Sequence, residues 1–178
     1  MKTVQVLDKT FVEYIQYSEI CNRVKAVAAK MEADLAGSKP LFIIMLNGAF
    51  MFAAELMKVY NAPAELSFIK YTSYDGTSST GEVKQLLGLA NDVEGRDVVI
   101  VEDIVESGLT MHCLFDLLRE RKAKSVRLAA LLFKPNCLKY DDVHIDYPVF
   151  TISDEFIVGF GLDYNGYGRN FKDIYKIK

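Results

Sequence analysis

The sequence predicts an α/β fold in which a parallel sheet is flanked by helices, and three observations support this prediction. Its strand-like segments are continuously apolar, which is typical of strands buried on both faces. Segments with helical periodicity separate them, as in a succession of βα units. The chain has 178 residues, of which 51% are hydrophobic, and this is enough for one domain with a buried core.

The first half of the chain supplies the first helix and the first βα unit. Apolar residues at three- and four-residue spacing predict a helix over residues 18–37, with Ser18 as its N-cap and Gly37 as its stop. The stretch "PLFIIMLNGAFMFAAELMKVY" then reads as a buried strand, a sharp turn at Asn47 and Gly48, and a second helix. These segments predict core structure with one turn at a strand end.

The middle of the chain repeats this pattern. "ELSFIKYTSY" predicts a further strand, "DVVIVED" predicts the most hydrophobic strand, and "SVRLAALLF" predicts the strand after it. A helix is expected over about 110–122, between the last two strands. Strands that alternate with helices in this way indicate parallel pairing.

Two regions depart from the βα pattern. Residues 72–86 are polar and rich in Ser, Thr and Gly, and a connection of this length is usually a lid or binding loop, or else disordered. Residues 135–178 supply short aromatic-rich strands and a glycine-rich tail. We expect them to form most of a small hood subdomain near the C-terminal ends of the strands, within one domain spanning residues 1–178.

Composition and charge argue against several classes of protein. Net charge is −3, from 21 basic and 24 acidic residues, and neither sign forms a block that would suggest binding to nucleic acid. No apolar run of about 18 residues and no secretory signal pattern occurs, so we expect a cytoplasmic protein without a membrane span. Cys21, Cys113 and Cys137 are widely spaced and are interpreted as buried thiols.

The most informative feature is the pair of acids, Glu102 and Asp103, at the end of the most hydrophobic strand. Ligands of open parallel sheets bind beyond the carboxyl ends of the strands. Ser107, Gly108 and Thr110 follow where a helix begins, and such a turn suits a phosphate. The acids would repel a phosphate, so they are expected to face sugar hydroxyls or a divalent cation. The alternative is a solvated strand end followed by an ordinary helix cap.

These motifs resemble a known family. "VVIVEDIVESGLT" resembles the phosphoribosyl pyrophosphate loop of type I phosphoribosyltransferases, and the rest of the chain resembles their hypoxanthine-guanine branch. "LNGAFMFAAEL" is similar to the pyrophosphate loop of that branch, "SYDGTSSTGEVK" to its mobile lid, "LLFKP" to its purine-contacting lysine segment and "FIVGFGLDYNGYGRN" to its purine and metal hood. The four further motifs, which stand in family order around this loop, favour the functional interpretation of the acid pair.

The resemblance implies purine salvage, in which a 5-phosphoribosyl group passes from phosphoribosyl pyrophosphate to hypoxanthine or guanine. Xanthine is a further candidate, and the products are IMP or GMP and pyrophosphate. Glu102 and Asp103 would hold the ribose hydroxyls, directly or through Mg²⁺, and Glu106 would be the general base at purine N7. The 5-phosphate would be bound by Ser107, Gly108, Leu109 and Thr110.

The remaining contacts are also implied by the resemblance. The pyrophosphate and lid contacts would come from Asn47, Gly48, Ser73, Tyr74 and Arg169. Asp163 would hold a second Mg²⁺. The purine would be bound by Lys134, Phe156, Ile157 and Asp163. A lysine ammonium only donates hydrogen bonds, so Lys134 favours a 6-oxo group over the 6-amino group of adenine. Without the resemblance, Phe156 reads as a core residue and Lys134 as a surface charge.

The chain departs from the family pattern in two places. Glu106 stands where the family usually has aspartate, and Asn47 stands where it often has lysine. The family's loop commonly holds a cis peptide bond, here Leu46–Asn47. Related enzymes are oligomeric, so a dimer or tetramer is expected, with Lys70 reaching across to a neighbour.

A second class of function remains open at this level. Some relatives of this fold are regulatory proteins that keep the phosphoribosyl pyrophosphate site as a sensor. Such a protein has less need of the lid, Lys134, Asp163 and Arg169, and it would be expected to carry an added basic or helix-turn-helix segment. No such segment is visible in the sequence, which favours the enzyme.

Overall fold

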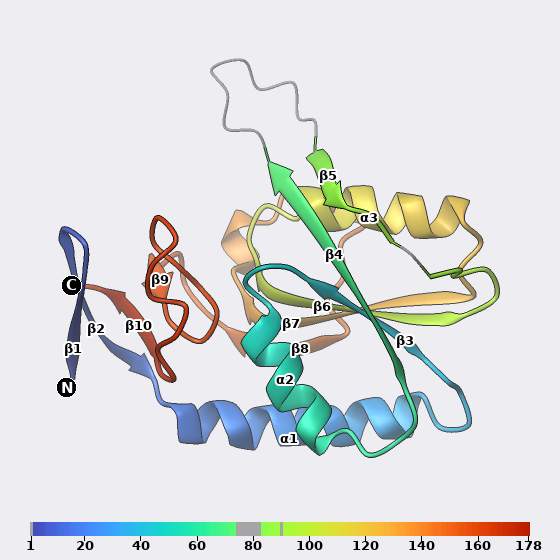
Figure 1. Cartoon of the computed structure of the whole chain (residues 1–178), viewed down its shortest axis with the longest axis horizontal. Coiled ribbons are helices and arrows are strands. Elements are labelled where there is room, and N and C mark those ends of the chain that lie inside the picture. Colours follow the sequence, from blue (N-terminus) through green and yellow to red (C-terminus); the bar gives the residue numbers. More distant parts are fainter. Residues whose placement is uncertain (1, 74–82, 90) are drawn as a thin grey trace.

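The computed structural model describes residues 2–73, 83–89 and 91–178, and its centre is a six-stranded sheet (Figure 1). The strand order is β5-β4-β3-β6-β7-β8, and the pairing is parallel except that β5 runs antiparallel to β4. The strands are β3 (Leu41–Met45), β4 (Glu65–Ser73), β5 (Val83–Leu87), β6 (Asp97–Val105), β7 (Ser125–Phe133) and β8 (Tyr147–Thr151).

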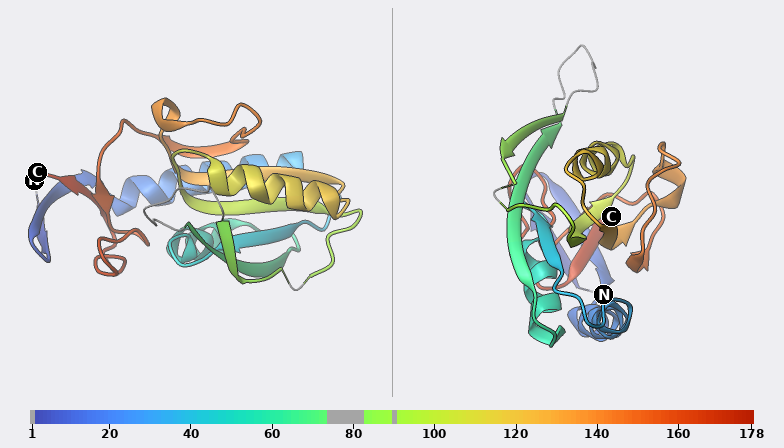
Figure 2. Two further views of the ribbon diagram at one scale, coloured as in Figure 1. Left: turned by 90° about the horizontal axis from the view of Figure 1, so that it is seen from above. Right: turned by 90° about the vertical axis from the view of Figure 1, so that its right-hand side faces the viewer.

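Helices cover both faces of this sheet, which confirms the predicted fold class. They are α1 (Tyr17–Asp34), α2 (Phe50–Val59) and α3 (Leu109–Glu120), with a short 3₁₀ turn, η1 (Pro135–Cys137). Helices α1 and α2 lie on one side of the sheet and α3 lies on the other (Figure 2). Every residue of β3 is buried, as expected for a central strand covered on both faces.

A second, four-stranded sheet forms the hood and joins the two ends of the chain. Its order is β1-β2-β10-β9, and its pairings are antiparallel. The strands are β1 (Thr3–Val6), β2 (Lys9–Ile15), β9 (Ile157–Val158) and β10 (Ile174–Ile177), and both termini lie at this end of the molecule (Figure 1).

The structure adds two details to the prediction that residues 135–178 form most of the hood. Strand β8 pairs in parallel with β7 and therefore belongs to the main sheet. Strands β1 and β2, from the N-terminus, supply half of the strands of the small sheet. Because β2 and β10 pair across nearly the whole length of the chain, periodicity along one segment could not reveal this partnership.

The first helix begins one residue earlier than predicted and does not use Ser18 as its cap. Gln16 is the N-cap residue and its side chain makes no capping hydrogen bond. The Asp173 carboxylate instead accepts a hydrogen bond from the Tyr17 backbone N–H at 2.8 Å. The helix ends at Asp34, before the turn that contains Gly37. A carboxylate of the hood thus provides a hydrogen-bond acceptor for a free backbone N–H at the start of α1.

The acid pair lies inside a strand rather than at its end. Strand β6 continues through Glu102 and Asp103 to Val105 because β7 extends far enough to pair with it, with Val105 opposite Phe133. Strands β4 and β5 extend into the predicted lid over residues 72–86, and residues 74–82 lie outside the described part of the chain. Within the described residues, no helix has both the length and the apolar character needed to cross a bilayer.

Candidate active site

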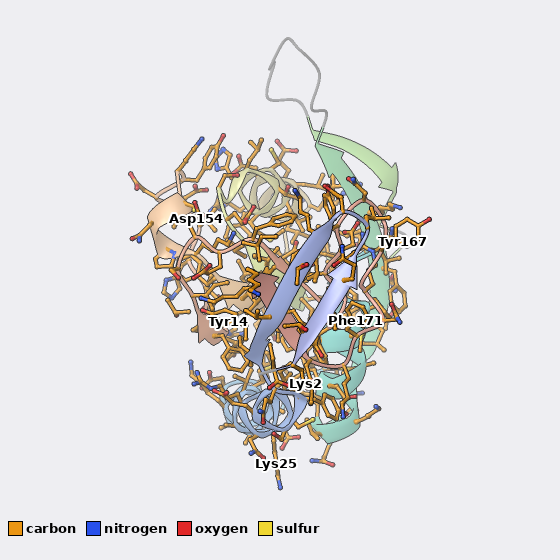
Figure 3. All side chains as sticks on the ribbon, turned by 90° about the vertical axis from the view of Figure 1, so that its left-hand side faces the viewer. Lys2, Tyr14, Lys25, Asp154, Tyr167 and Phe171 are labelled. Carbon is orange, nitrogen blue, oxygen red and sulfur yellow. The ribbon has the colours of Figure 1, made fainter. Side chains whose placement is uncertain are left out.

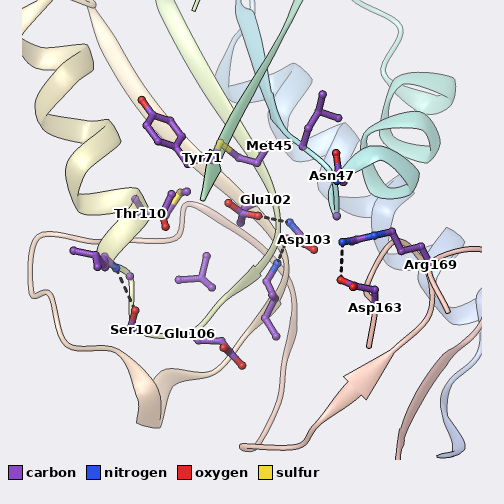
Figure 4. Close-up of a pocket in the computed structure, with 17 residues that line it drawn as sticks. Met45, Asn47, Tyr71, Glu102, Asp103, Glu106, Ser107, Thr110, Asp163 and Arg169 are labelled. Atoms are coloured by element: carbon purple, nitrogen blue, oxygen red, sulfur yellow. Dashed lines mark hydrogen bonds and ion pairs between the residues drawn. The ribbon is translucent and has the colours of Figure 1, made fainter. Parts of the chain in front are cut away.

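A cavity of about 470 Å³ opens at the carboxyl ends of β3 and β6. Three segments form its wall: the turn that follows β3, the end of β6 with the turn into α3, and the hood (Figure 4). The predicted site residues that it brings together are Asn47, Gly48, Glu102, Asp103, Glu106, Ser107, Gly108, Leu109, Thr110, Asp163 and Arg169. Met45 and Tyr71 also line it, although no sequence pattern singled them out as site residues.

The acid pair lies in the middle of this wall. The Glu102 carboxylate accepts a hydrogen bond from the Asp103 backbone N–H at 3.1 Å, and the Asp103 carboxylate accepts one from Ile104 N–H at 3.0 Å. Both side chains are half-buried. Loss of contact with water, together with the adjacent Asp103 carboxylate, raises the pKa of Glu102 well above its ordinary value. Among the described residues, neither acid has an ion-pair partner.

Two glycines allow the three segments to approach one another closely. A Cβ atom on Gly48 would lie 1.6 Å from Oδ2 of Asp103, so only glycine fits beside the acid pair. A Cβ atom on Gly161 would lie 2.0 Å from the carbonyl oxygen of Gly48. Gly161 was not among the predicted site residues, and its only sequence signal is the glycine-rich character of the tail. Through these two contacts the turn after β3 lies directly between β6 and the hood.

The turn into α3 has the form expected of an anion site. Gly108 is the N-cap residue of α3 with φ of +82°, a conformation that favours glycine. The Ser107 hydroxyl accepts a weak hydrogen bond from Leu109 N–H at 3.4 Å, and Thr110 lies in the first turn of the helix. Because the first backbone N–H groups of a helix lack partners within it, this turn can bind a phosphate.

Asp163 and Arg169 face the acid pair from the hood (Figure 4). Arg169 forms an ion pair with Asp163 at 2.6 Å and donates a hydrogen bond to the Gly161 carbonyl at 2.6 Å. The second oxygen of Asp163 accepts a hydrogen bond from Gly166 N–H at 2.6 Å. Asp163 and Arg169 therefore fix each other's position through this ion pair. Within the described part of the chain, no group of three or more His, Cys, Asp or Glu residues is arranged to hold a metal ion.

Lys134 is buried, so its interpretation as a surface charge is wrong. It is 5% exposed, and its ammonium forms ion pairs with Glu106 and, at 3.2 Å, with Asp154. Burial acts to lower the pKa of Lys134, but the two carboxylates outweigh it and raise the pKa above its ordinary value. Asp154 was not predicted, and its only sequence signal is its position shortly after β8. Glu106 lines the cavity and is ion-paired with Lys134, which does not line it.

The predicted purine residues Phe156 and Ile157 do not line the cavity. Phe156 is 43% exposed, so its reading as a core residue is wrong, and its ring packs edge-on against Tyr164. Ile157 is buried in β9. Among the described residues that line the cavity, neither of the two occurs. Ser73 is the last residue of β4, and Tyr74 lies outside the described residues.

The turn after β3 has the expected cis peptide bond between Leu46 and Asn47. Lys70 follows Ile69, the residue of neighbouring strand β4 that pairs with Met45, and it donates a hydrogen bond to the Asn47 side chain at 3.3 Å. Lys70 was expected to reach a neighbouring subunit, and within this chain it reaches the predicted pyrophosphate loop. A lysine charge is thus present beside Asn47, although the loop itself has none.

The chain was compared with protein families and with known proteins. A family model described as phosphoribosyl transferase domain matches residues 13–165. A hypoxanthine-guanine phosphoribosyltransferase of Streptococcus agalactiae is 42% identical over 162 residues, which are 89% of each chain. The chain belongs to this family.

Further relatives extend the likeness to three dimensions. The curated hypoxanthine-guanine phosphoribosyltransferase of Bacillus subtilis is 41% identical over 92% of this chain and 91% of its own. A crystal structure of such an enzyme from Bacillus anthracis superposes with a TM-score of 0.89 at 36% identity, covering 94% of this chain and 98% of the other. The fold therefore agrees with that of hypoxanthine-guanine phosphoribosyltransferases.

Proposed function

We propose that this phosphoribosyltransferase moves the 5-phosphoribosyl group of phosphoribosyl pyrophosphate to hypoxanthine or guanine, giving IMP or GMP and pyrophosphate. The proposal is carried by one observation: three features line the same cavity. They are the acid pair, the turn into α3, and Glu106, which is paired with Lys134. The named relatives support the same reaction.

The ribose and its 5-phosphate fit the half of the cavity formed by β6 and α3. The backbone N–H groups of the turn from Ser107 to Thr110 bind the phosphate, with the positive end of the helix dipole behind them. Glu102 and Asp103, a few residues earlier on the same strand, accept hydrogen bonds from the ribose hydroxyls. This arrangement holds the sugar with C1 directed toward the purine.

The donor set of the site fits a magnesium ion. Glu102 and Asp103 are adjacent carboxylates without an ion-pair partner among the described residues. Burial and the neighbouring Asp103 carboxylate raise the pKa of Glu102, an effect that a bound cation would oppose. Magnesium takes one or two carboxylates and completes its shell with water and substrate phosphates, so a cluster of three acids is not required. Such an ion would neutralise charge on the leaving pyrophosphate. Asp163 is the proposed ligand of a second ion, once substrate separates it from Arg169.

The purine would lie between Glu106 and the hood. N9 of the base forms a bond to C1 of the ribose as the bond from C1 to pyrophosphate breaks, and the proton on N7 passes to the Glu106 carboxylate. Lys134 donates a hydrogen bond to the 6-oxo group. Phe156 is proposed to stack on the base, and the backbone at Ile157 and Asp163 to read its far edge.

The pyrophosphate half is proposed to use Asn47, Gly48 and Arg169. An arginine can meet phosphate oxygens with two parallel hydrogen bonds. In this role Arg169 exchanges its bond with Asp163 for bonds with the substrate. Ser73 and Tyr74 are proposed to close over the bound substrates and exclude water, which would otherwise compete with the purine for C1.

The proposed enzyme is a cytoplasmic homo-oligomer. Leu66 and Phe68 are 42% and 47% exposed, and their two-residue spacing places both on one face of β4. Phe50, at the start of α2, is 44% exposed. Exposed apolar side chains of this size support an interface with a second copy. The three cysteines are free thiols, in agreement with a reducing compartment, but they are half-buried rather than buried as predicted.

The proposal is tested by a spectrophotometric assay of the wild-type protein with phosphoribosyl pyrophosphate, Mg²⁺ and each of hypoxanthine, guanine, xanthine and adenine. We expect rapid formation of IMP and GMP and loss of activity in excess EDTA. Adenine should be rejected by a wide margin, because an amino group leaves the Lys134 ammonium without an acceptor. Equal rates with adenine would contradict the purine assignment, and the absence of transfer to every base would contradict the reaction.

A further inference from the structure

Three charged residues meet at the carboxyl ends of three adjacent strands. Glu106 directly follows β6, Lys134 directly follows β7, and Asp154 lies three residues after β8. The Lys134 backbone N–H donates a hydrogen bond to the Val105 carbonyl at 3.0 Å, which continues the pairing of β6 and β7 beyond the strands. This hydrogen bond fixes the backbone position of Lys134. Because β7 lies between β6 and β8, the strand on each side of Lys134 is followed by an acid.

The surroundings of Lys134 differ from those of its two partners. Its side chain is 6% exposed, whereas those of Glu106 and Asp154 are 52% and 74% exposed. Figure 3 shows Asp154 on the opposite side of the small sheet from Tyr167. An ammonium has three N–H donors. Two of them bond the carboxylates, which leaves the third for a ligand.

This geometry gives Glu106 two roles that conflict. In the substrate-free protein it neutralises the buried ammonium. In the proposed reaction it accepts a proton from purine N7 and becomes neutral. A buried charge whose counter-charge has been removed is strongly disfavoured. A second carboxylate is needed to keep Lys134 charged and directed at the 6-oxo group while Glu106 carries the proton.

We propose that Asp154 is the positioning residue that supplies this second carboxylate. It holds the Lys134 ammonium throughout the reaction, while Glu106 exchanges its ion pair for the purine proton. This inference rests on the proposed function. It gives Asp154, a residue of the loop after β8 that does not line the cavity, a part in the recognition of oxopurines.

The test compares Asp154→Asn with a matched control, Glu155→Gln. Glu155 is the adjacent acid, and its carboxylate bonds Lys176 at 2.9 Å rather than Lys134. Because Asp154 is largely exposed, we expect a moderate loss in Asp154→Asn, about 10-fold in kcat/KM for hypoxanthine and guanine. KM for phosphoribosyl pyrophosphate and the melting temperature should stay at wild-type values. Asp154→Glu should restore most of the loss, and Glu155→Gln should match the wild type.

A binding measurement separates this inference from the proposed reaction, because it needs no turnover. Calorimetric titration with IMP should show affinity about 10-fold weaker in Asp154→Asn than in the wild type. If the wild type transfers phosphoribosyl groups and Asp154→Asn matches it in both kcat/KM and IMP affinity, the positioning role is wrong and the reaction stands. If the wild type is inactive with every base but its IMP affinity depends on Asp154, the reaction is wrong and the positioning role stands.

Discussion

The main sheet and the hood contribute to the same cavity in different ways. On the main sheet, Glu102, Asp103 and the turn to Thr110 lie within one βα unit, so neighbours in sequence are neighbours in the site. The hood contributes through contacts between distant segments, such as Gly161 against Gly48. Residues on the sheet are placed by local structure, whereas those on the hood depend on how the chain ends are joined.

The largest effect that would sharpen this comparison is expected at Gly48. Gly48→Ala would place a methyl group within 1.6 Å of Asp103 Oδ2, so the acid or the turn must move. Displacements of about 1 Å in a catalytic site cost on the order of 100-fold in rate. We expect a loss of that size in kcat/KM for both substrates, measured at steady state. Gly95→Ala is the control, because a Cβ there meets no atom within 4 Å and the strain from its φ of +69° should lower stability rather than kcat/KM. Equal losses in the two variants would show that the close approach to Asp103 is unimportant.

A smaller and more selective effect is expected from the hood. Asp163→Asn removes the charge that pairs with Arg169 and that would hold a second magnesium ion. We expect KM for phosphoribosyl pyrophosphate to rise about 10-fold, with the melting temperature nearly unchanged because partly exposed ion pairs add little stability. Asp8→Asn is the control, since Asp8 is a hood acid that bonds Tyr164 outside the cavity. A large fall in melting temperature with unchanged kinetics would make Asp163 a structural residue.

The smallest effect on activity is expected where the two regions are joined. Asp173 is buried and accepts the Tyr17 N–H, so Asp173→Ala should lower the free energy of unfolding by about 2 kcal/mol without changing KM for either substrate. Chemical denaturation measures the first quantity, and Asp141→Ala, at an exposed acid, is the control. A loss of purine affinity with unchanged stability would contradict the structural role of Asp173.

The same contact predicts a dependence on pH. Burial acts to raise the pKa of Asp173, but the Tyr17 N–H and the Lys2 ammonium hold it below its ordinary value. A carboxyl whose pKa is lower in the folded state stabilises the protein above its unfolded pKa of about 3.9, and this stability is lost as pH falls through the folded pKa. The difference between the wild type and Asp173→Ala should therefore be full at neutral pH and shrink in acid. A difference that does not change with pH would show that the charge of Asp173 is unimportant.

The comparison also explains which parts of the structure the sequence could predict. The buried strands and the helices between them follow from periodicity, and the turn at Gly108 follows from its place between β6 and α3. The partnership of β2 with β10 and the contact of Gly161 with Gly48 depend on tertiary pairing, and no local pattern encodes it. Family resemblance supplied Asp163 and Arg169, which local reasoning would not have joined.

Burial was the main source of error at single residues. Lys134 is buried because both neighbouring strands provide an acid for its ammonium, and one of those acids, Asp154, is 20 residues away in the chain. Phe156 is exposed although its residue type is usually buried. In both cases the decisive neighbours lie on other elements of the structure.

The central claim is that Glu106, released from Lys134, is the general base, and replacing it by glutamine tests this most directly. Glu106→Gln keeps the size of the side chain but cannot accept the N7 proton. General base catalysis contributes about 10² to 10⁴ in rate, so single-turnover measurements with hypoxanthine and guanine should show a loss of that order. The affinity for phosphoribosyl pyrophosphate should change much less, because its phosphate is proposed to bind at the turn before α3. Glu106→Asp should remain active. Near-normal turnover in Glu106→Gln would contradict the claim and leave the chemistry to leaving-group and electrostatic stabilisation alone.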